Sequence, residues 1–108
     1  MEAEPFFPDP QGAELDAVVT AIAAVEREIR GLEGRKRALL ARVRQVSDAV
    51  CVAEGRTGRA AELVHRAASA EVGFALGIAD RSAEALIERS HDLCTRFAGA
   101  YAALASGR

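Results

Sequence analysis

Residues 13–54, AELDAVVTAIAAVEREIRGLEGRKRALLARVRQVSDAVCVAE, decide the fold of this chain. Apolar residues recur in this stretch at alternating steps of three and four, and Lys36 is the one polar residue in the series. This spacing places the series on one face of a helix, so we predict a single amphipathic helix, roughly 60 Å long. The series, called here the heptad seam, consists of Leu15, Val18, Ile22, Val25, Ile29, Leu32, Lys36, Leu39, Val43, Val46 and Val50.

Two shorter helices are predicted after the long one. The segment Gly55-Arg56-Thr57-Gly58 is the clearest break in the chain, and we expect the chain to reverse there. Helices should follow over residues 59–76 and 80–105, with Asp80 or Ser82 capping the last one. The predicted fold class is all-α, with the long N-terminal helix packed against a helix-turn-helix-like hairpin.

The heptad seam needs a cover, and two arrangements supply one. The two shorter helices, laid end to end, roughly match the long helix in length and could cover it within one chain. The competing arrangement is a helical bundle formed or completed by dimerisation, with Lys36 setting the register. A parallel pair would bring Glu28 against Glu33, so an antiparallel pair, or a mixed bundle of two chains, fits better. The predicted self-association residues are Leu15, Ile22, Ile29, Lys36, Leu39 and Val43.

The domain organisation follows from the prolines and the length. Pro5, Pro8 and Pro10 predict that residues 1–12 form a flexible acidic arm, because proline disrupts helix interiors. Residues 13–108 should form a single all-helical domain. No apolar run approaches the length of a membrane span, and the acidic start lacks the features of a secretory signal. We therefore expect a cytoplasmic protein in which Cys51 and Cys94 are thiols.

The charge of the chain is −2 overall but unevenly distributed. The first 25 residues carry carboxylates and no basic residue, whereas residues 26–59 are rich in arginine. This basic stretch is the part of the sequence best suited to an anionic partner such as duplex DNA, through phosphate contacts. The same arginines also suit the solvated face of a helix. The candidate nucleic-acid-binding residues are Arg35, Arg37, Arg42, Arg44, Arg56, Arg59, Arg66 and Arg81.

Residues 71–86 have the spacing of a helix-turn-helix. Gly73 would let two helices approach closely, and Gly77 would supply the turn between them. The second helix could then enter a DNA groove. Its charge argues against that, because four carboxylates at steps of four form an acidic ridge that phosphate would repel. The acidic ridge consists of Asp80, Glu84, Glu88 and Asp92.

Four segments of the C-terminal part resemble a known family. They are residues 70–78 (AEVGFALGI), 80–83 (DRSA), 93–97 (LCTRF) and 102–108 (AALASGR). They are similar to the N-terminal helical domain of unknown function in the 13E12 repeat family, where it precedes an HNH endonuclease domain. The resemblance covers about the last forty residues and implies an endonuclease-associated role. Ala98 stands where the family commonly has proline.

The sequence offers no constellation for catalysis. It lacks a His-Asn-His arrangement, so the nuclease activity of the family does not transfer to this chain. His65 and His91 have none of the ligand spacings of a zinc site, and no glycine-rich phosphate loop is present. We therefore predict no enzyme, no metal and no cofactor.

Two functions are consistent with these observations. The first is a self-associating helical module that acts as a DNA-associated or regulatory accessory protein. The second is a protein-interaction adaptor without a nucleic-acid role, in which the heptad seam grips a partner helix and the acidic ridge meets a basic surface.

Overall fold

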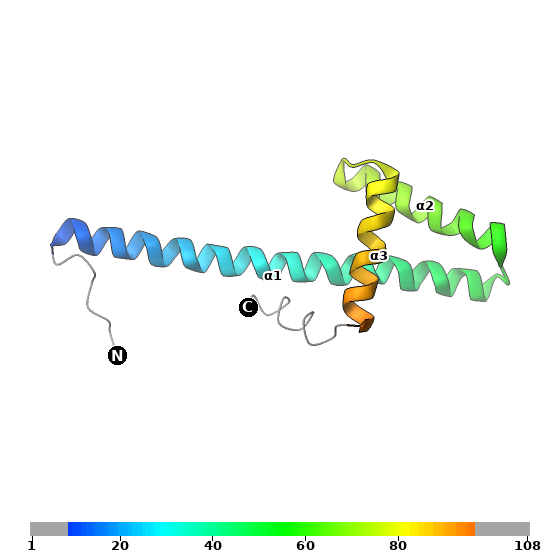
Figure 1. Cartoon of the computed structure of the whole chain (residues 1–108), viewed down its shortest axis with the longest axis horizontal. Helices are drawn as coiled ribbons and strands as arrows, with labels where there is room; N and C mark the ends of the chain where they lie inside the picture. The colour runs from blue at the N-terminus through cyan, green and yellow to red at the C-terminus, as the bar shows by residue number, and fades with distance from the viewer. Residues whose placement is uncertain (1–8, 97–108) are drawn as a thin grey trace.

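The computed structural model describes residues 9–96 and shows three helices (Figure 1). They are α1 (Pro10–Ala53), α2 (Gly58–Leu76) and α3 (Asp80–Arg96). The predicted all-α fold, with a long first helix packed against a hairpin of two shorter ones, is confirmed. Residues 1–8 of the predicted arm and residues 97–105 of the predicted third helix lie outside the described residues.

Helix α1 begins three residues earlier than predicted, at Pro10. The prediction that the arm extends to Gly12 was wrong, because Pro10 occupies the first turn, where the missing amide hydrogen costs nothing. Asp9 caps the helix, and its side chain accepts a hydrogen bond from the backbone N–H of Gly12. Proline therefore starts this helix instead of preventing it.

Both predicted breaks are present. Gly55 has a positive φ of 63° in the turn between α1 and α2. Gly77 ends α2 in the left-handed conformation, where the Ile78 N–H donates to the Gly73 carbonyl over 2.9 Å. The Gly77 N–H donates to the Phe74 carbonyl, which completes a Schellman motif. This motif satisfies the last carbonyls of α2 and turns the chain into α3.

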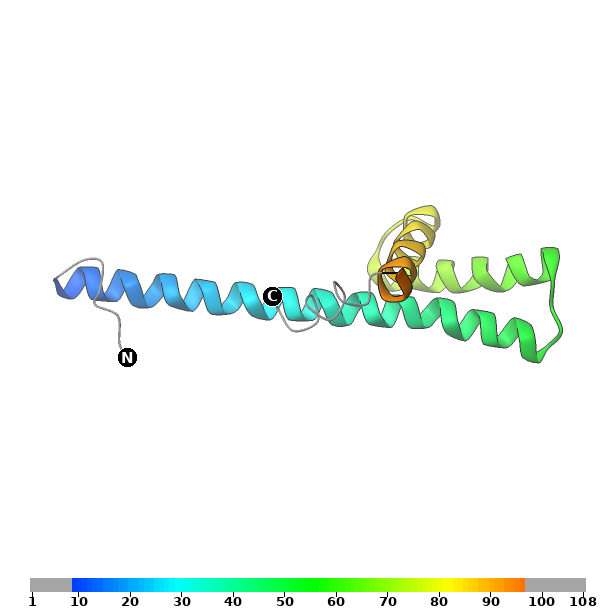
Figure 2. The same cartoon turned by 60° about the horizontal axis from the view of Figure 1, so that its bottom comes forward.

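The two shorter helices pack on one half of α1. Helix α2 doubles back beside the C-terminal half of α1, and α3 crosses that same half (Figures 1 and 2). The N-terminal half of α1 extends away from both, so the molecule is elongated, with extents of 69 × 28 × 16 Å. Within residues 9–96, α2 and α3 therefore do not lie end to end along α1, so the arrangement that would cover the whole heptad seam within one chain is not the one seen there.

The core between the helices is small and built from small side chains. Helix α1 contributes Leu40, Ala41, Ser47 and Cys51, while α3 contributes mainly Ile87. Ser47 donates to the Val43 carbonyl over 2.9 Å, so its buried hydroxyl is satisfied within its own helix. The remaining buried residues in the described part of the chain are Gly12 and Gly34 of α1, Ser69 and Gly73 of α2, and Ala83 and Ser90 of α3.

The buried face of α1 differs from the predicted one by one residue. The heptad seam predicted Leu39, Val46 and Val50 at the centre, and these stay 69%, 47% and 37% exposed. The structure buries the following residues instead, Leu40, Ser47 and Cys51. A straight helix has about 3.6 residues per turn and drifts from a 3.5-residue repeat by about 20° per heptad. A strict seven-residue series therefore does not stay on one face of a straight helix.

Candidate functional site

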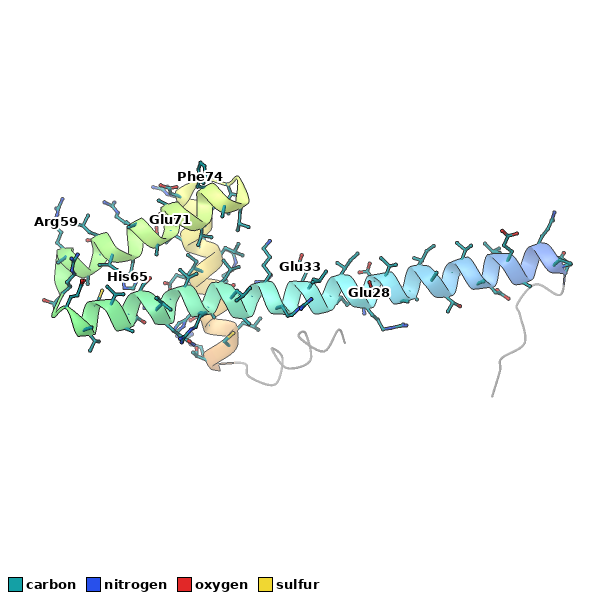
Figure 3. The ribbon with its side chains drawn as sticks, turned by 180° about the vertical axis from the view of Figure 1, so that it is seen from behind. Glu28, Glu33, Arg59, His65, Glu71 and Phe74 are labelled. Atoms are coloured by element: carbon teal, nitrogen blue, oxygen red, sulfur yellow. The ribbon has the colours of Figure 1, made fainter. Side chains whose placement is uncertain are left out.

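The most prominent surface feature is a row of exposed apolar side chains on the N-terminal half of α1. Each of these side chains is between 46% and 62% exposed, although the heptad spacing gathers them on one face. Figure 3 shows this half of α1, up to Glu28 and Glu33, extending beyond α2 and α3. An apolar face of this length usually marks an interaction site. The exposed stripe, as it is called below, consists of Leu15, Val18, Ile22, Val25, Ile29 and Leu32.

The predicted self-association residues fall into two groups. Leu15, Ile22 and Ile29 belong to the exposed stripe. The other three lie further along α1, where Lys36 and Leu39 are exposed and Val43 is half-buried. These three line the same groove between α1 and the C-terminal end of α2. The structure therefore brings the six residues onto one continuous side of α1.

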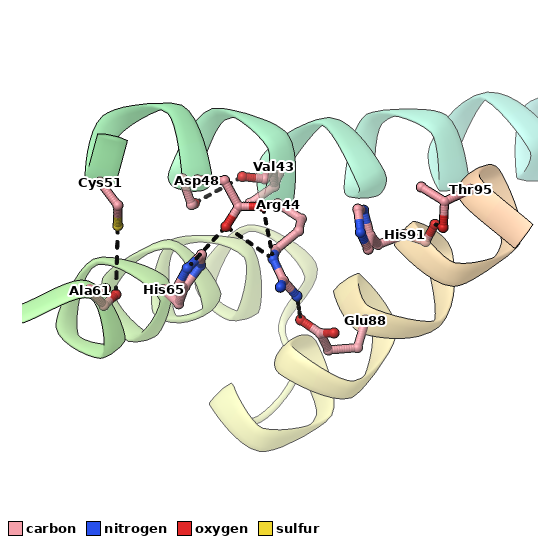
Figure 4. A network of polar contacts seen from close by, with 10 residues as sticks. Val43, Arg44, Asp48, Cys51, Ala61, His65, Glu88, His91 and Thr95 are labelled. Carbon is pink, nitrogen blue, oxygen red and sulfur yellow. Dashed lines mark hydrogen bonds and ion pairs between the residues drawn. The ribbon is translucent and has the colours of Figure 1, made fainter. Parts of the chain in front are cut away.

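A polar network joins the three helices behind this side (Figure 4). The Arg44 guanidinium of α1 donates to Asp48 of the same helix over 3.2 Å and to Glu88 of α3. Asp48 also lies 3.3 Å from Nε2 of His65 in α2. Arg44 was predicted to bind nucleic acid, but it holds α3 against α1. The Arg44–Asp48 spacing is visible in the sequence, whereas the contacts to His65 and Glu88 depend on the tertiary fold.

The network also affects the pKa of Arg44. Partial desolvation, the largest single effect, lowers the pKa of Arg44. The hydrogen bonds and charges of Glu88 and Asp48 together outweigh it and leave the pKa above its ordinary value. Arg44 is therefore a cation that its own helices already engage, and it offers little to an external phosphate.

The arginines of α1 do not form one basic patch. Arg35 and Arg42 are a heptad apart and share the side that carries the grooves beside α2. Arg37 and Arg44 lie on a different face, and both are half-buried. The four predicted contacts therefore point in two directions, and Arg35 and Arg42 remain the exposed pair.

The arginines after α1 are also dispersed. In the turn, Arg56 pairs with Glu54, with 2.9 Å between Nε and Oε2. Arg59 is exposed at the start of α2, far from the hairpin turn near Phe74 (Figure 3). Arg66 and Arg81 line one surface hollow, so they converge from α2 and α3. Of the eight candidates, this pair lies closest to the predicted helix-turn-helix.

The acidic ridge of α3 is partly engaged. Glu88 pairs with Arg44. Asp80 and Glu84 line the hollow that contains Arg66 and Arg81, and Asp92 is half-buried. The two carboxylates offset the charge of the two arginines, so the hollow is mixed in charge. The charge of the acidic ridge is therefore partly offset by nearby arginines, and the ridge is not a single repulsive surface.

Residues 9–96 contain neither a candidate metal-binding cluster nor a membrane-spanning helix. Within that range, no cluster of three or more His, Cys, Asp or Glu residues is placed to hold a metal ion. None of the three helices described carries a stretch both long and apolar enough to traverse a bilayer. Cys51 and Cys94 are free thiols, and the Cys51 sulfur lies 3.9 Å from the Ala61 carbonyl oxygen.

Comparison with known proteins gave no match to a family model, a curated protein or a solved structure. The resemblance to the 13E12 repeat family therefore stays a prediction that rests on the quoted segments.

Proposed function

We propose that this chain is a non-enzymatic helical module that self-associates through the exposed stripe of α1 and serves as a regulatory accessory protein. The observation that supports this function is the stripe itself. Six aliphatic side chains follow a heptad spacing on a helix that the rest of residues 9–96 leaves uncovered. Heptad-spaced residues of this kind bury themselves against a second helix.

The physical drive for association is the burial of the stripe. Burying one Val, Leu or Ile side chain fully contributes about 1.5–3 kcal/mol, and a symmetric dimer would bury the stripe of both copies. The β-branched residues Ile22 and Ile29 suit a two-stranded coil. Helix α3 does not line the groove beside the stripe and would stay accessible.

The test is the oligomeric state of the wild-type protein and of Ile29→Asp, measured by light scattering with helicity followed by circular dichroism. We expect a wild-type dimer and a folded Ile29→Asp monomer, because a buried unpaired carboxylate disfavours the interface. Val52→Asp is the matched control: Val52 is also β-branched and on α1, and it is 83% exposed outside the stripe. A monomeric wild-type protein, or Ile29→Asp that dimerises normally, would contradict the function.

A more specific form of this function is association with duplex DNA. The convergence of Arg66 and Arg81 beside the helix-turn-helix-like hairpin favours it. Phosphate contacts would make affinity fall steeply with salt, and Arg66→Ala with Arg81→Ala should reduce that slope. Arg35→Ala with Arg42→Ala tests the α1 pair in the same way. The resemblance to the 13E12 repeat family would connect such binding to an endonuclease.

The alternative is a protein-interaction adaptor without a nucleic-acid role. The same exposed stripe favours it, because an amphipathic partner helix could occupy the place of a second copy. Fluorescence anisotropy with a labelled duplex at low salt separates the two functions. Binding that disappears in the arginine variants supports DNA association, and no binding at low salt supports the adaptor.

A further inference from the structure

A groove continues the exposed stripe toward the hairpin. It encloses about 540 Å³ between α1 and the C-terminal end of α2. Its apolar walls include Leu39 and Val43 of α1 and Val72 and Leu76 of α2, and Arg35 and Lys36 stand at its edge. Leu32 belongs both to the groove and to the stripe. The two features therefore form one continuous path, which is apolar except at Lys36.

The path is the one that a second helix would follow. Lys36, Leu39 and Val43 of the groove are the members of the heptad seam that come directly after Leu32. In a two-stranded coiled coil the seam winds slowly around each helix. A partner helix that follows the seam over the exposed stripe therefore continues into the groove. A smaller hollow of about 310 Å³, lined by Val46, extends the path further along α1.

The charges at the two ends of the path are complementary. Between positions 9 and 25 the chain carries Asp9, Glu14 and Asp16 and no basic residue. At the groove stand Arg35 and Lys36, and within residues 9–96 neither has an ion pair. An antiparallel pair of α1 helices brings each acidic end to the basic edge of the other copy. A parallel pair would bring acidic end to acidic end.

We propose that the groove binds the acidic N-terminal end of α1 from a second copy of this chain, in an antiparallel dimer. Leu15 of one copy lies in the groove of the other, close to Leu32 or Leu39, and Glu14 lies beside Arg35 and Lys36. The proposal rests on the proposed self-association and specifies its orientation. Each dimer contains two such grooves, so every contact occurs twice.

The orientation is tested by disulfide trapping, because a disulfide needs two Cα atoms within about 4.4–6.8 Å. The background protein carries Cys51→Ala and Cys94→Ala and must dimerise like the wild type. Leu15→Cys is mixed with Leu39→Cys or Leu32→Cys, with one protein tagged to give each product a distinct mass. We expect the mixed disulfide in at least one mixture, and little product from Leu15→Cys alone.

The other outcomes are distinct. A disulfide formed by Leu15→Cys alone indicates a parallel dimer and overturns the orientation, while self-association itself survives. A wild-type dimer without any mixed disulfide indicates that something else fills the groove, including another segment of the same chain, and also overturns the proposal. A monomeric wild-type protein contradicts the proposed self-association, and the question of orientation then does not arise.

A charge exchange tests the role of the groove edge. Arg35→Glu with Lys36→Glu should weaken dimerisation by about tenfold, because each exposed pair contributes little but is present twice. Adding Glu14→Lys to that variant should restore most of the loss. Arg59→Glu with Arg66→Glu makes the same change in charge away from the groove and should leave dimerisation unchanged. Equal weakening by both double variants would show a net-charge effect and contradict the contact.

Discussion

Gly73 is the residue on which the close approach of α2 to the start of α3 depends. A Cβ at this position would lie 2.9 Å from the Ile78 carbonyl oxygen and 3.2 Å from Oδ1 of Asp80. The first contact is with backbone, so the Schellman turn itself would have to move. Glycine is needed here because of space, whereas Gly77, at a φ of 69°, is needed for its conformation.

Gly73→Ala should therefore destabilise the protein by about 1–3 kcal/mol, the cost of overpacking a tight contact. The measurement is urea unfolding followed by circular dichroism. An ordinary glycine-to-alanine change inside a helix stabilises by roughly 0.5–1 kcal/mol, so the sign of the effect is decisive. A more stable Gly73→Ala variant would mean that the hairpin opens freely.

Arg44 and Glu88 provide the second prediction at this scale. Their side chains are 30% and 51% exposed, so solvent screens the pair substantially. A double-mutant cycle with Arg44→Ala and Glu88→Ala should give a coupling of about 0.5–1 kcal/mol in unfolding free energy. The matched control is Glu26 with Arg30, an exposed pair within α1 at 3.8 Å, whose coupling should be smaller. Equal coupling energies for the two pairs would show that Arg44 and Glu88 contribute no more than an ordinary exposed pair.

These residues show what the sequence can and cannot predict locally. Gly73 and Gly77 were identified from spacing, because a turn between two helices needs a small residue and a left-handed residue at fixed positions. Arg44 was assigned to nucleic acid because its charge is visible in the sequence, whereas its partner on α3 is not. Glu88 lies far from it in the sequence, and only the crossing of α3 over α1 brings them together.

At the scale of elements, α1 depends on two different kinds of support. Its C-terminal half is packed against α2 and α3, while its N-terminal half is supported within residues 9–96 by its own hydrogen bonds and by the Asp9 cap. The heptad seam predicted this helix correctly. It placed the buried face one residue off, because α2 and α3 pack on the side of α1 next to the seam.

Asp9→Ala should loosen the first turn of α1, because a lost cap costs about 1 kcal/mol. Amide hydrogen exchange of residues 11–13 should become faster, since these amides lie next to the capped end. Exchange in α2 and α3 should not change, because neither helix contacts the N-terminal turn. Glu28→Ala, at an exposed position further inside α1, is the comparison variant. Faster exchange throughout the protein would contradict the independence of the two halves.

At the scale of the whole molecule, the all-helical composition and the order of the helices were predictable, and the arrangement was not. Helix lengths alone allowed an end-to-end cover of α1, since α2 and α3 together roughly match it. The Schellman turn at Gly77 folds α3 across α1 instead of along it. As a result, the stripe residues Leu15, Ile22 and Ile29 are exposed. The candidate interface can therefore be located only from the arrangement of the helices.

An antiparallel dimer through the stripe and groove would place the two hairpins at opposite ends of the molecule. Gln45 is exposed on α1 near the hairpin, and a spin label at Gln45→Cys reports this arrangement in a background of Cys51→Ala and Cys94→Ala. If Leu15 pairs with Leu32 or Leu39, the two labels should be about 55–65 Å apart at about 1.5 Å per residue.

A parallel dimer would instead hold the same labels within about 25 Å, close to the spacing of two adjacent helices plus the label arms. Pulsed electron paramagnetic resonance distinguishes the two distances. Ile29→Asp added to the labelled protein should remove the dipolar signal, because the dimer dissociates while α2 and α3 keep the hairpin folded. A short distance, or a signal that persists in Ile29→Asp, would show that the copies meet through a surface other than the path along α1.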